Sequence, residues 1–387
     1  MQAMAPFRSL RCTARRPHRE KHTKFNNLRR IGEVPERSGG VTLYRAVRKG
    51  NWMLCFVDDA MPGITRKRRG RYWMYFDSEG NRISDREEID RLNRIGLPPA
   101  YRDAWLCPTP HGHIQAVGYD AKGRKQYRYH EEFRAQQDAA KYDRCASFGR
   151  ALPKLRERVD QDLAKRSLSR DAVAAAIVRL LDTEYLRVGN EAYAQENKSF
   201  GATTLRARHA KVLGRSVKMR FTGKHGIVRE LTITDRNLTR LVRRCHDLPG
   251  QHLFQYVDDA GVAQPVTSSD VNAYIKEAMG EEFTAKHFRT WGASVIAFEQ
   301  LCAAGDRGIT MKQMLEPVAA ALGNTPAISR KSYVHPALIE AVKANARDPL
   351  GQLQCPRPTK YLSSAERGLI LFLEAGAAET ETEAKAA

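Results

Sequence analysis

The chain has 387 residues, with 65 Lys and Arg against 44 Asp and Glu, a formal net charge of +21 and an isoelectric point near 9.8. Hydrophobic residues make up 42%, enough for two domains with a core. The charge favours a polyanionic partner such as nucleic acid but says nothing about chemistry. The longest apolar stretch, 172–178, is far too short to cross a bilayer, so we expect a soluble protein.

The seven cysteines are dispersed and form neither a CxxC pair nor a His/Cys cluster at zinc-ligand spacing. We therefore expect no metal site, and reduced thiols in a cytoplasmic compartment. The positions are Cys12, Cys55, Cys107, Cys145, Cys245, Cys302 and Cys355.

The N-terminal region is rich in arginine. Residues 1–50 hold thirteen Lys and Arg and three Glu, so +10 of the net charge of +21 lies there. A transit peptide has a similar composition. We favour the alternative of a disordered basic extension over 1–55, or an over-extended start site. The end of the chain, 371–387, has few bulky apolar residues and is expected to be a disordered tail.

Strand and turn signals follow, from about 53 to 134. The aromatic run RYWMYF at 71–76 is typical of a strand, and DSEGN at 77–81 of a turn. A second run, 113–117, is followed by the turn sequence DAKGR at 120–124 and then by KQYRYH. This pattern predicts a small sheet whose hairpins carry Lys, Arg and Tyr.

Beyond Glu131 the pattern becomes helical. A helix is predicted from Leu168 to Leu186, with a capping cluster at its start and Gly189 as its left-handed terminator. Alternating apolar and polar residues over 203–233 then predict three strands, with turns near Gly214 and at 223–226.

After Asp235 we predict helices to about 375, interrupted by GDRG and GNTP. The fold class is therefore α+β. A small β-rich domain (56–135) precedes a larger, mainly α domain (136–370) that contains a three-stranded antiparallel sheet.

Five residues at edges of predicted elements match the needs of transesterification at a phosphodiester. They are Arg187, Lys224, Arg289, Asn324 and Tyr333. A tyrosine can attack phosphorus, guanidinium groups neutralise the non-bridging oxygens, and an amide adds a hydrogen bond. A lysine among arginines can protonate the leaving oxygen, because neighbouring positive charge lowers its pKa.

Each of the five also has an ordinary interpretation. Arg187 could complement a helix dipole, Lys224 could be a solvated turn lysine, and Tyr333 could be a packed aromatic. Asn324 could be a turn or cap residue.

The surrounding segments resemble those of type IB DNA topoisomerases, the poxvirus and bacterial group in particular. GNTPAISRKSY at 323–333 is similar to the nucleophile segment, and KHFRTWG at 286–292 to the segment of the second arginine. EYLRVGNE at 184–191 resembles the first-arginine segment, FTGKH at 221–225 the lysine hairpin, and 112–130 the DNA-clamping hairpin. The five matches occur in the expected order. They also imply the tyrosine recombinase/topoisomerase IB fold.

The resemblance implies a mechanism. Tyr333 attacks and forms a 3′-phosphotyrosyl link, while Arg187, Arg289 and Asn324 hold the transition state and Lys224 acts as general acid. Rotation of the free end relaxes supercoils without metal, nucleotide or other cofactor, and no GxxxxGK[ST] loop is present. Where poxvirus enzymes carry a histidine this chain has Asn324, which can donate a hydrogen bond but cannot exchange a proton.

Nine residues are predicted to contact DNA. Interleaved Tyr and Arg on one hairpin more often mark a nucleic-acid face than a solubilising turn. The nine are Lys122, Arg124, Lys125, Gln126, Tyr127, Arg128 and Tyr129 on the hairpin, with Arg206 and His209 from the β interval. The basic run at 66–71 is open between phosphate contact and solvated charge.

Two rival functions remain. A tyrosine recombinase shares the chemistry, but its HxxR motif is not met, because His287 and Arg289 are two residues apart; we interpret His287 as structural or as a secondary DNA contact. A DNA-binding protein with a decayed site is disfavoured, because all five catalytic residue types are present. We expect a monomer on double-stranded DNA, with no membrane partner, in the cytoplasm and associated with a bacterial nucleoid.

Overall fold

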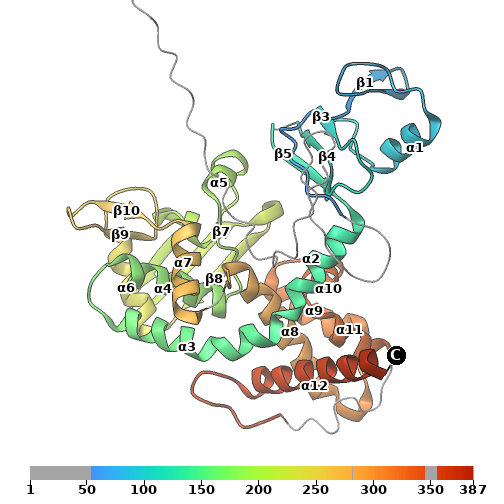
Figure 1. Ribbon diagram of the computed structural model, residues 1–387. Helices are drawn as coiled ribbons and strands as arrows, with labels where there is room; N and C mark the ends of the chain where they lie inside the picture. The colour runs from blue at the N-terminus through green and yellow to red at the C-terminus, as the bar shows by residue number, and fades with distance from the viewer. Residues whose placement is uncertain (1–53, 122, 281, 345–354, 387) are drawn as a thin grey trace, which may run out of the picture. The chain divides into compact units, whose positions relative to one another are not determined.

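The computed structural model describes residues 54–121, 123–280, 282–344 and 355–386 (Figure 1). The chain divides into two compact units, Met1–Gln136 and Gln137–Ala387. The boundary expected from the sequence was 135/136. Lys122 and nearly all of the expected basic extension lie outside the described residues.

In its described residues, the first unit contains two small antiparallel sheets and one complete helix. Its elements are β1 (Thr65–Arg69), β2 (Tyr72–Phe76), α1 (Arg86–Arg94), β3 (Arg102–Leu106), β4 (Ile114–Tyr119) and β5 (Lys125–Tyr129). β1 pairs with β2, and β3, β4 and β5 form a sheet in that order. Ile64, Tyr75, Leu92, Leu97 and Leu106 form its core with Ala116.

The first unit differs from the sequence-based prediction in three places. Helix α1 was not predicted, although Asp85 accepts hydrogen bonds from its first backbone N–H groups and caps it. Leu54 and Cys55, assigned to the disordered extension, are buried and belong to this unit. The basic run at 66–71 is largely strand β1, where Arg66 stacks on Trp73 at 4.0 Å and is structural.

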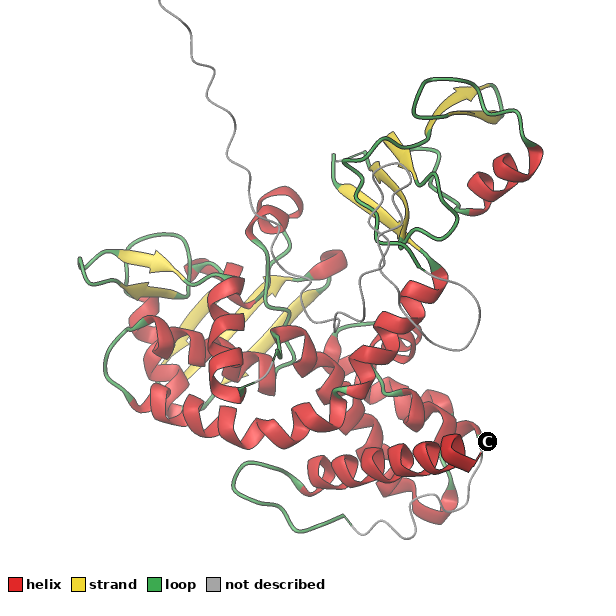
Figure 2. Cartoon of the chain, viewed as in Figure 1, coloured by secondary structure: helices red, strands yellow, loops and turns green. Residues whose placement is uncertain are grey.

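The second unit is mainly helical around one three-stranded sheet (Figure 2). Its elements are α3 (Cys145–Ala164), α4 (Arg170–Thr183), α5 (Glu191–Asn197), β6 (Ala210–Leu213), β7 (Ser216–Thr222), β8 (Val228–Ile233), α6 (Arg236–His246), β9 (Gln255–Val257), β10 (Ala263–Pro265), α7 (Ser268–Met279), α8 (Ala285–Ala304), α9 (Met311–Leu322), α10 (Pro326–Ser332), α11 (Pro336–Lys343) and α12 (Ser364–Ala386). Helix α2 (Glu131–Asp143) spans the division between the units.

Helix α4 lies at the centre of the second unit. Its Ala, Val, Ile and Leu residues are buried on nearly every face, and it packs against α3, α6, α7 and α8. A helix that is apolar all round is stable only when other elements cover it. Each large side chain buried here stabilises the fold by about 1.5–3 kcal/mol, so this core holds the ends of its helices in fixed places.

The sheet β6–β7–β8 is antiparallel and in this order, as the alternating pattern predicts. On β7, Val217, Met219 and Phe221 are buried, while Lys218 and Arg220 between them are exposed. The period of two therefore sets which face meets the helices. The predicted fold class, α+β with a small β-rich N-terminal domain and a mainly α domain around a three-stranded sheet, is confirmed.

Three predictions in the second unit are wrong. The central helix ends at Thr183 instead of Leu186, because Tyr185 takes a left-handed φ of 51° and breaks the helix before Gly189. The hairpin β9–β10 was missed, because its three-residue strands are too short for an alternating pattern. Helix α12 continues to Ala386 where a disordered tail was expected from 371. Leu373 is buried in the core, and alanine and glutamate beyond it favour helix even where large apolar side chains are absent.

Candidate active site

Arg187 lies in an irregular segment that follows α4, not at a helix end as expected. Its own carbonyl group and that of the next residue are fixed by hydrogen bonds from Ala202 N to Arg187 O at 2.8 Å and from Thr203 N to Val188 O at 2.7 Å. A Cβ on Gly201 would lie 2.6 Å from the Arg187 carbonyl oxygen, so only glycine permits this approach. Two separate segments thereby aim the Arg187 side chain.

Asn324 and Tyr333 lie at the ends of α9 and α10, two helices joined by a short connection. α9 ends at Gly323, whose φ of 61° is the left-handed conformation that glycine favours. Asn324 follows, and its Oδ1 accepts a hydrogen bond from Arg187 Nη2 at 3.1 Å. Thr325 then caps α10, and Tyr333 is the C-cap residue of that helix.

Arg289 comes from the first turns of α8 and is 5% exposed. Its guanidinium group donates to the Tyr185 carbonyl oxygen and, at 3.0 Å, to the Leu322 carbonyl oxygen. The guanidinium carbon lies 4.8 Å from the centroid of the Tyr333 ring. Burial and the neighbouring Arg187 lower the pKa of Arg289 to about 10, so it remains a cation at neutral pH.

Lys224 begins the turn between β7 and β8 and is exposed. It lines one small pocket together with Arg187, Arg289 and Gly323. Its placement on a turn between two paired strands leaves the ammonium group free to reach a bound molecule. Four of the five predicted catalytic residues thus have contacts in one region, and Lys224 faces it from the hairpin.

The positive charges of Arg187, Lys224 and Arg289 affect the pKa of Tyr333, the candidate nucleophile. Burial raises the pKa of Tyr333, but the positive charges of Arg289, Arg187 and Lys224 outweigh it, and the net pKa lies below the usual value. A phenol with a lowered pKa gives up its proton more readily when it attacks. The site is therefore arranged to stabilise negative charge on Tyr333.

Two buried donors of the site lack partners among the described residues. Asn324 Nδ2 and Arg289 Nε are both shielded from solvent and make no hydrogen bond to another described group. A buried donor without a partner costs about 1–3 kcal/mol, which a bound acceptor would offset. A phosphoryl oxygen is an acceptor that both donors could share.

Two residues near the site were not predicted. Arg229 on β8 lines the same pocket as Arg187 and Arg289. Lys141 on α2 donates to the Ser332 carbonyl oxygen, and its Nζ lies 5.7 Å from the centroid of the Tyr333 ring. Neither lies within a recognised segment. The only sequence signal for Arg229 is its place five residues after Lys224 on the same hairpin.

The predicted DNA-contacting hairpin is β4–β5 in the first unit. Tyr127 and Tyr129 are 41% and 47% exposed, and their rings stack with centroids 5.8 Å apart. The exposed Arg128 donates to the Gly96 carbonyl oxygen at 3.1 Å.

Three other hairpin residues already have protein partners. Arg124 pairs with Asp120 at 2.7 Å, and Gln126 donates to the same carboxylate at 3.2 Å. Lys125 pairs with Asp59 at 2.5 Å. A phosphate that takes Arg124 or Lys125 would have to compete with a carboxylate.

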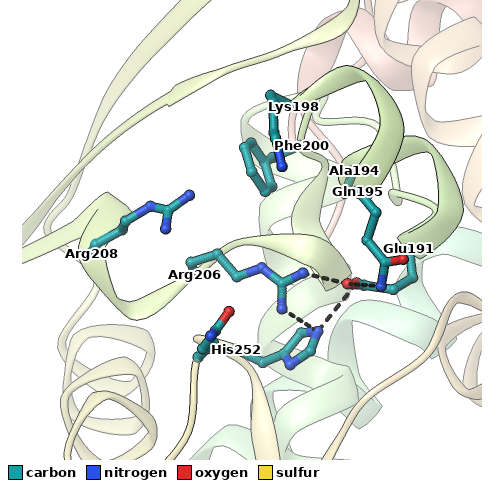
Figure 3. Close-up of a pocket in the computed structure, with 9 residues that line it drawn as sticks. Glu191, Ala194, Gln195, Lys198, Phe200, Arg206, Arg208 and His252 are labelled. Carbon is teal, nitrogen blue, oxygen red and sulfur yellow. Dashed lines mark hydrogen bonds and ion pairs between the residues drawn. The ribbon is translucent and has the colours of Figure 1, made fainter.

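Arg206 and His209, the remaining predicted contacts, are also engaged. Figure 3 shows Arg206 between Glu191 and His252, with Arg206 Nη1 2.6 Å from His252 Nε2. His252 Nε2 lies 3.1 Å from Glu191 Oε2, which closes the triangle. His209 Nδ1 accepts from Arg206 N at 3.1 Å. In this network the exposed Arg208, which lines the same pocket, is the more accessible cation.

His287 is structural in this fold. Its Nδ1 interacts with Thr284 at the start of α8, and its ring stacks on Phe148 with centroids 5.6 Å apart. Burial lowers its pKa to about 4. Within the described ranges, no helix is long and apolar enough to span a membrane, and no cluster of three or more His, Cys, Asp or Glu could hold a metal ion.

Both units match models of known protein families. A family model described as eukaryotic DNA topoisomerase I, catalytic core, matches residues 130–352. A second, described as bacterial DNA topoisomerase IB, N-terminal domain, matches residues 72–120. All five candidate catalytic residues fall within the first match.

Similar proteins agree with these matches. The DNA topoisomerase 1B of Acanthamoeba polyphaga mimivirus is 32% identical over 298 residues, which cover 74% of this chain and 89% of that protein. The DNA topoisomerase 1B of vaccinia virus (strain Copenhagen) is 24% identical over 235 residues, 59% of this chain and 72% of the viral one. A solved structure of the site-specific recombinase XerH on a palindromic difH substrate matches 50% of each chain at 18% identity, with a TM-score of 0.32, too low to carry an argument.

Proposed function

Because this chain belongs to the type IB DNA topoisomerase family, a family of DNA-binding enzymes, we propose that it relaxes supercoiled duplex DNA by cutting and rejoining one strand through Tyr333. The reaction uses neither a metal ion nor a nucleotide, because the covalent intermediate conserves the energy of the phosphodiester bond. It is an isomerisation of DNA topology.

One observation carries this proposal. The side chains of Arg187 and Asn324 are joined at 3.1 Å, Arg289 lies 4.8 Å from the Tyr333 ring, and buried donors of Asn324 and Arg289 meet no partner in the described part of the chain. This is a preformed set of donors beside a phenol. Donors aimed at developing negative charge often supply more of the rate enhancement of an enzyme than any other single effect.

The proposed cleavage step follows from these positions. The Tyr333 oxygen releases its proton to solvent and attacks phosphorus. A bond forms between this oxygen and the phosphorus, which stays attached to the 3′ end of the strand, while the bond from phosphorus to the 5′ oxygen breaks. Arg187, Arg289 and Asn324 bind the non-bridging oxygens. Lys224 gives its proton to the departing 5′ oxygen and takes it back when that oxygen attacks the phosphotyrosine.

A relaxation assay tests the proposal. Purified protein is incubated with negatively supercoiled plasmid in EDTA without ATP, with Tyr333→Phe alongside. We expect the wild type to produce a ladder of topoisomers, and denaturant-quenched samples to contain protein linked to DNA. The Phe variant should bind DNA but show neither. Formation of a covalent protein–DNA adduct by Tyr333→Phe would show that Tyr333 is not the nucleophile.

The same assay separates the rival function. A tyrosine recombinase would assemble as a tetramer at a specific site, whereas the proposed enzyme acts on plasmid DNA as a monomer. Wild-type protein that binds plasmid tightly without relaxing it would favour the recombinase or a catalytically silent protein.

Binding should also depend strongly on salt. With six or more phosphates neutralised by Lys and Arg, the affinity for duplex DNA falls roughly 10³-fold or more between 50 and 200 mM salt. A nearly flat response would contradict binding through an extensive basic surface.

A further inference from the structure

Arg229 connects the two chain segments that carry Arg187 and Asn324. Its Nη2 donates to the Glu184 carbonyl oxygen at 3.1 Å, and its Nη1 donates to the Ala321 carbonyl oxygen at 3.0 Å. Glu184 ends α4 three residues before Arg187, and Ala321 lies in the last turn of α9, three residues before Asn324. One planar guanidinium group thus spans both segments.

Arg289 makes a parallel connection one residue further along. It donates to the carbonyl oxygens of Tyr185 and Leu322, the residues that follow the two acceptors of Arg229. The two arginines come from different elements, β8 and α8, yet bind consecutive carbonyl groups of the same two segments. Together they form a double clamp.

The accepting carbonyl groups explain why arginine is suited to this place. The last carbonyl groups of a helix have no partner within the helix and lie at the negative end of its dipole. Arg229 satisfies one such group at the end of α4 and another at the end of α9. A lysine at the same position has a single ammonium group and lacks the fork that reaches two separate carbonyl groups.

Close packing keeps the Asn324 segment against this guanidinium group. A Cβ on Gly323 would lie 2.8 Å from Arg229 Nη1, and Gly323 has a φ of 61° that other residues rarely adopt. The residue before Asn324 therefore rests directly on Arg229. Movement of Arg229 would release Gly323 and with it the 3.1 Å contact between Asn324 and Arg187.

The surroundings of Arg229 disfavour its positive charge. Burial lowers its pKa, the Glu184 carboxylate opposes this, and the positive charge of Arg187 lowers it further. A half-buried cation beside other cations is destabilising unless hydrogen bonds offset the loss of solvation, and here the two carbonyl groups supply them.

We infer that Arg229 is a positioning residue for strand cleavage: its clamp on the ends of α4 and α9 sets the separation of Arg187 and Asn324. This inference rests on the proposed function. Arg229 acts through those two residues and does not itself bind the reacting phosphate.

The test compares Arg229→Lys and Arg229→Gln with wild type in single-turnover cleavage and in DNA binding. Both variants should form the covalent adduct at least tenfold more slowly, while the Kd for duplex DNA changes less than twofold. Arg220→Gln is the matched control: Arg220 pairs with Glu230 on the same sheet, with 75% and 67% of the side chains exposed. Its rates should equal those of the wild type. Cleavage by Arg229→Lys at the wild-type rate would show that a positive charge at position 229 is sufficient. It would overturn the inference that the two hydrogen bonds of Arg229 position Arg187 and Asn324.

A double-mutant cycle separates positioning from general destabilisation. In the Asn324→Ala background one of the two groups that Arg229 positions is gone, so adding Arg229→Gln should slow cleavage by a smaller factor than it does in the wild-type background. A full additional loss would contradict action through Asn324.

If Arg229→Gln does not fold, Gly323→Ala provides a second route. Its Cβ displaces the Arg229 guanidinium group, and it should slow cleavage at least tenfold. A folded Gly323→Ala protein that cleaves at the wild-type rate would overturn the inference. Wild-type protein that forms no adduct in the same experiment would instead refute the proposed function.

Discussion

Replacing Asn324 with alanine removes a carboxamide that has two roles in the site. Its oxygen accepts from Arg187 at 3.1 Å, and its nitrogen is a buried donor with no partner among the residues that the structure describes. Loss of one donor aimed at developing charge lowers a rate by about 10²–10³, equivalent to about 2.7–4 kcal/mol of transition-state stabilisation. We expect Asn324→Ala to slow single-turnover adduct formation by this factor.

Stability should change much less than the rate. Loss of the hydrogen bond to a charged partner costs about 1.5–3 kcal/mol, while loss of the buried, unpaired amide nitrogen returns about 1–3 kcal/mol. The two effects have opposite signs, so the net change is within about 2 kcal/mol and the Tm shift within about 8 °C. Differential scanning calorimetry measures this value on the same sample.

Two further substitutions at position 324 sharpen the test. Asn324→Asp keeps an acceptor for Arg187 but loses the donor and places an anion beside the phosphate, so cleavage should slow at least as much as in Asn324→Ala. Asn324→His restores a donor and should stay within about tenfold of wild type. Wild-type cleavage by Asn324→Ala would refute the reasoning, because the unpartnered donor would then have no role in the transition state.

Three other predictions concern charge. Arg187→Gln removes one of the cations that lower the pKa of Tyr333, so the rise of the cleavage rate with pH should shift to higher pH in single-turnover assays. Glu366→Ala breaks a buried ion pair with Arg156 of 2.6 Å and should cost about 3 kcal/mol, lowering Tm by about 6–12 °C in calorimetry. His287 has a folded pKa of about 4, below the ordinary 6.5. Protonation therefore favours the unfolded state, and stability in urea should fall as pH decreases from 6.5 toward 4, less steeply in His287→Gln.

Each of these has a result that would count against it. An unchanged pH profile in Arg187→Gln would mean that Arg187 does not stabilise the phenolate of Tyr333. A Tm unchanged in Glu366→Ala would mean that α12 is not fastened through Arg156. Identical pH dependence of unfolding in wild type and His287→Gln would show that other groups dominate the titration.

The sequence determined the parts of this protein that depend on local pattern. The alternation over 203–233 predicted three strands because each side chain on a strand chooses one of two faces, and β6–β8 have that register. The segments at 184–191, 286–292 and 323–333 could be matched to catalytic segments of a known family because each match depends only on residues close together in the sequence. These signals placed Arg187, Arg289 and Tyr333 in one candidate site before any fold was known.

Only the tertiary structure decided how these residues are held. The left-handed Tyr185 that ends α4 early depends on room that Gly292 leaves for its ring, more than a hundred residues away. Arg229 donates hydrogen bonds to backbone carbonyl groups. Every residue has such a group, so the identity of the accepting residue gives no signal in the sequence. Likewise, Arg206 was predicted to contact DNA, but a carboxylate and an imidazole brought in by other elements engage it. Contacts between distant segments arise from packing of the core, and no local pattern records them.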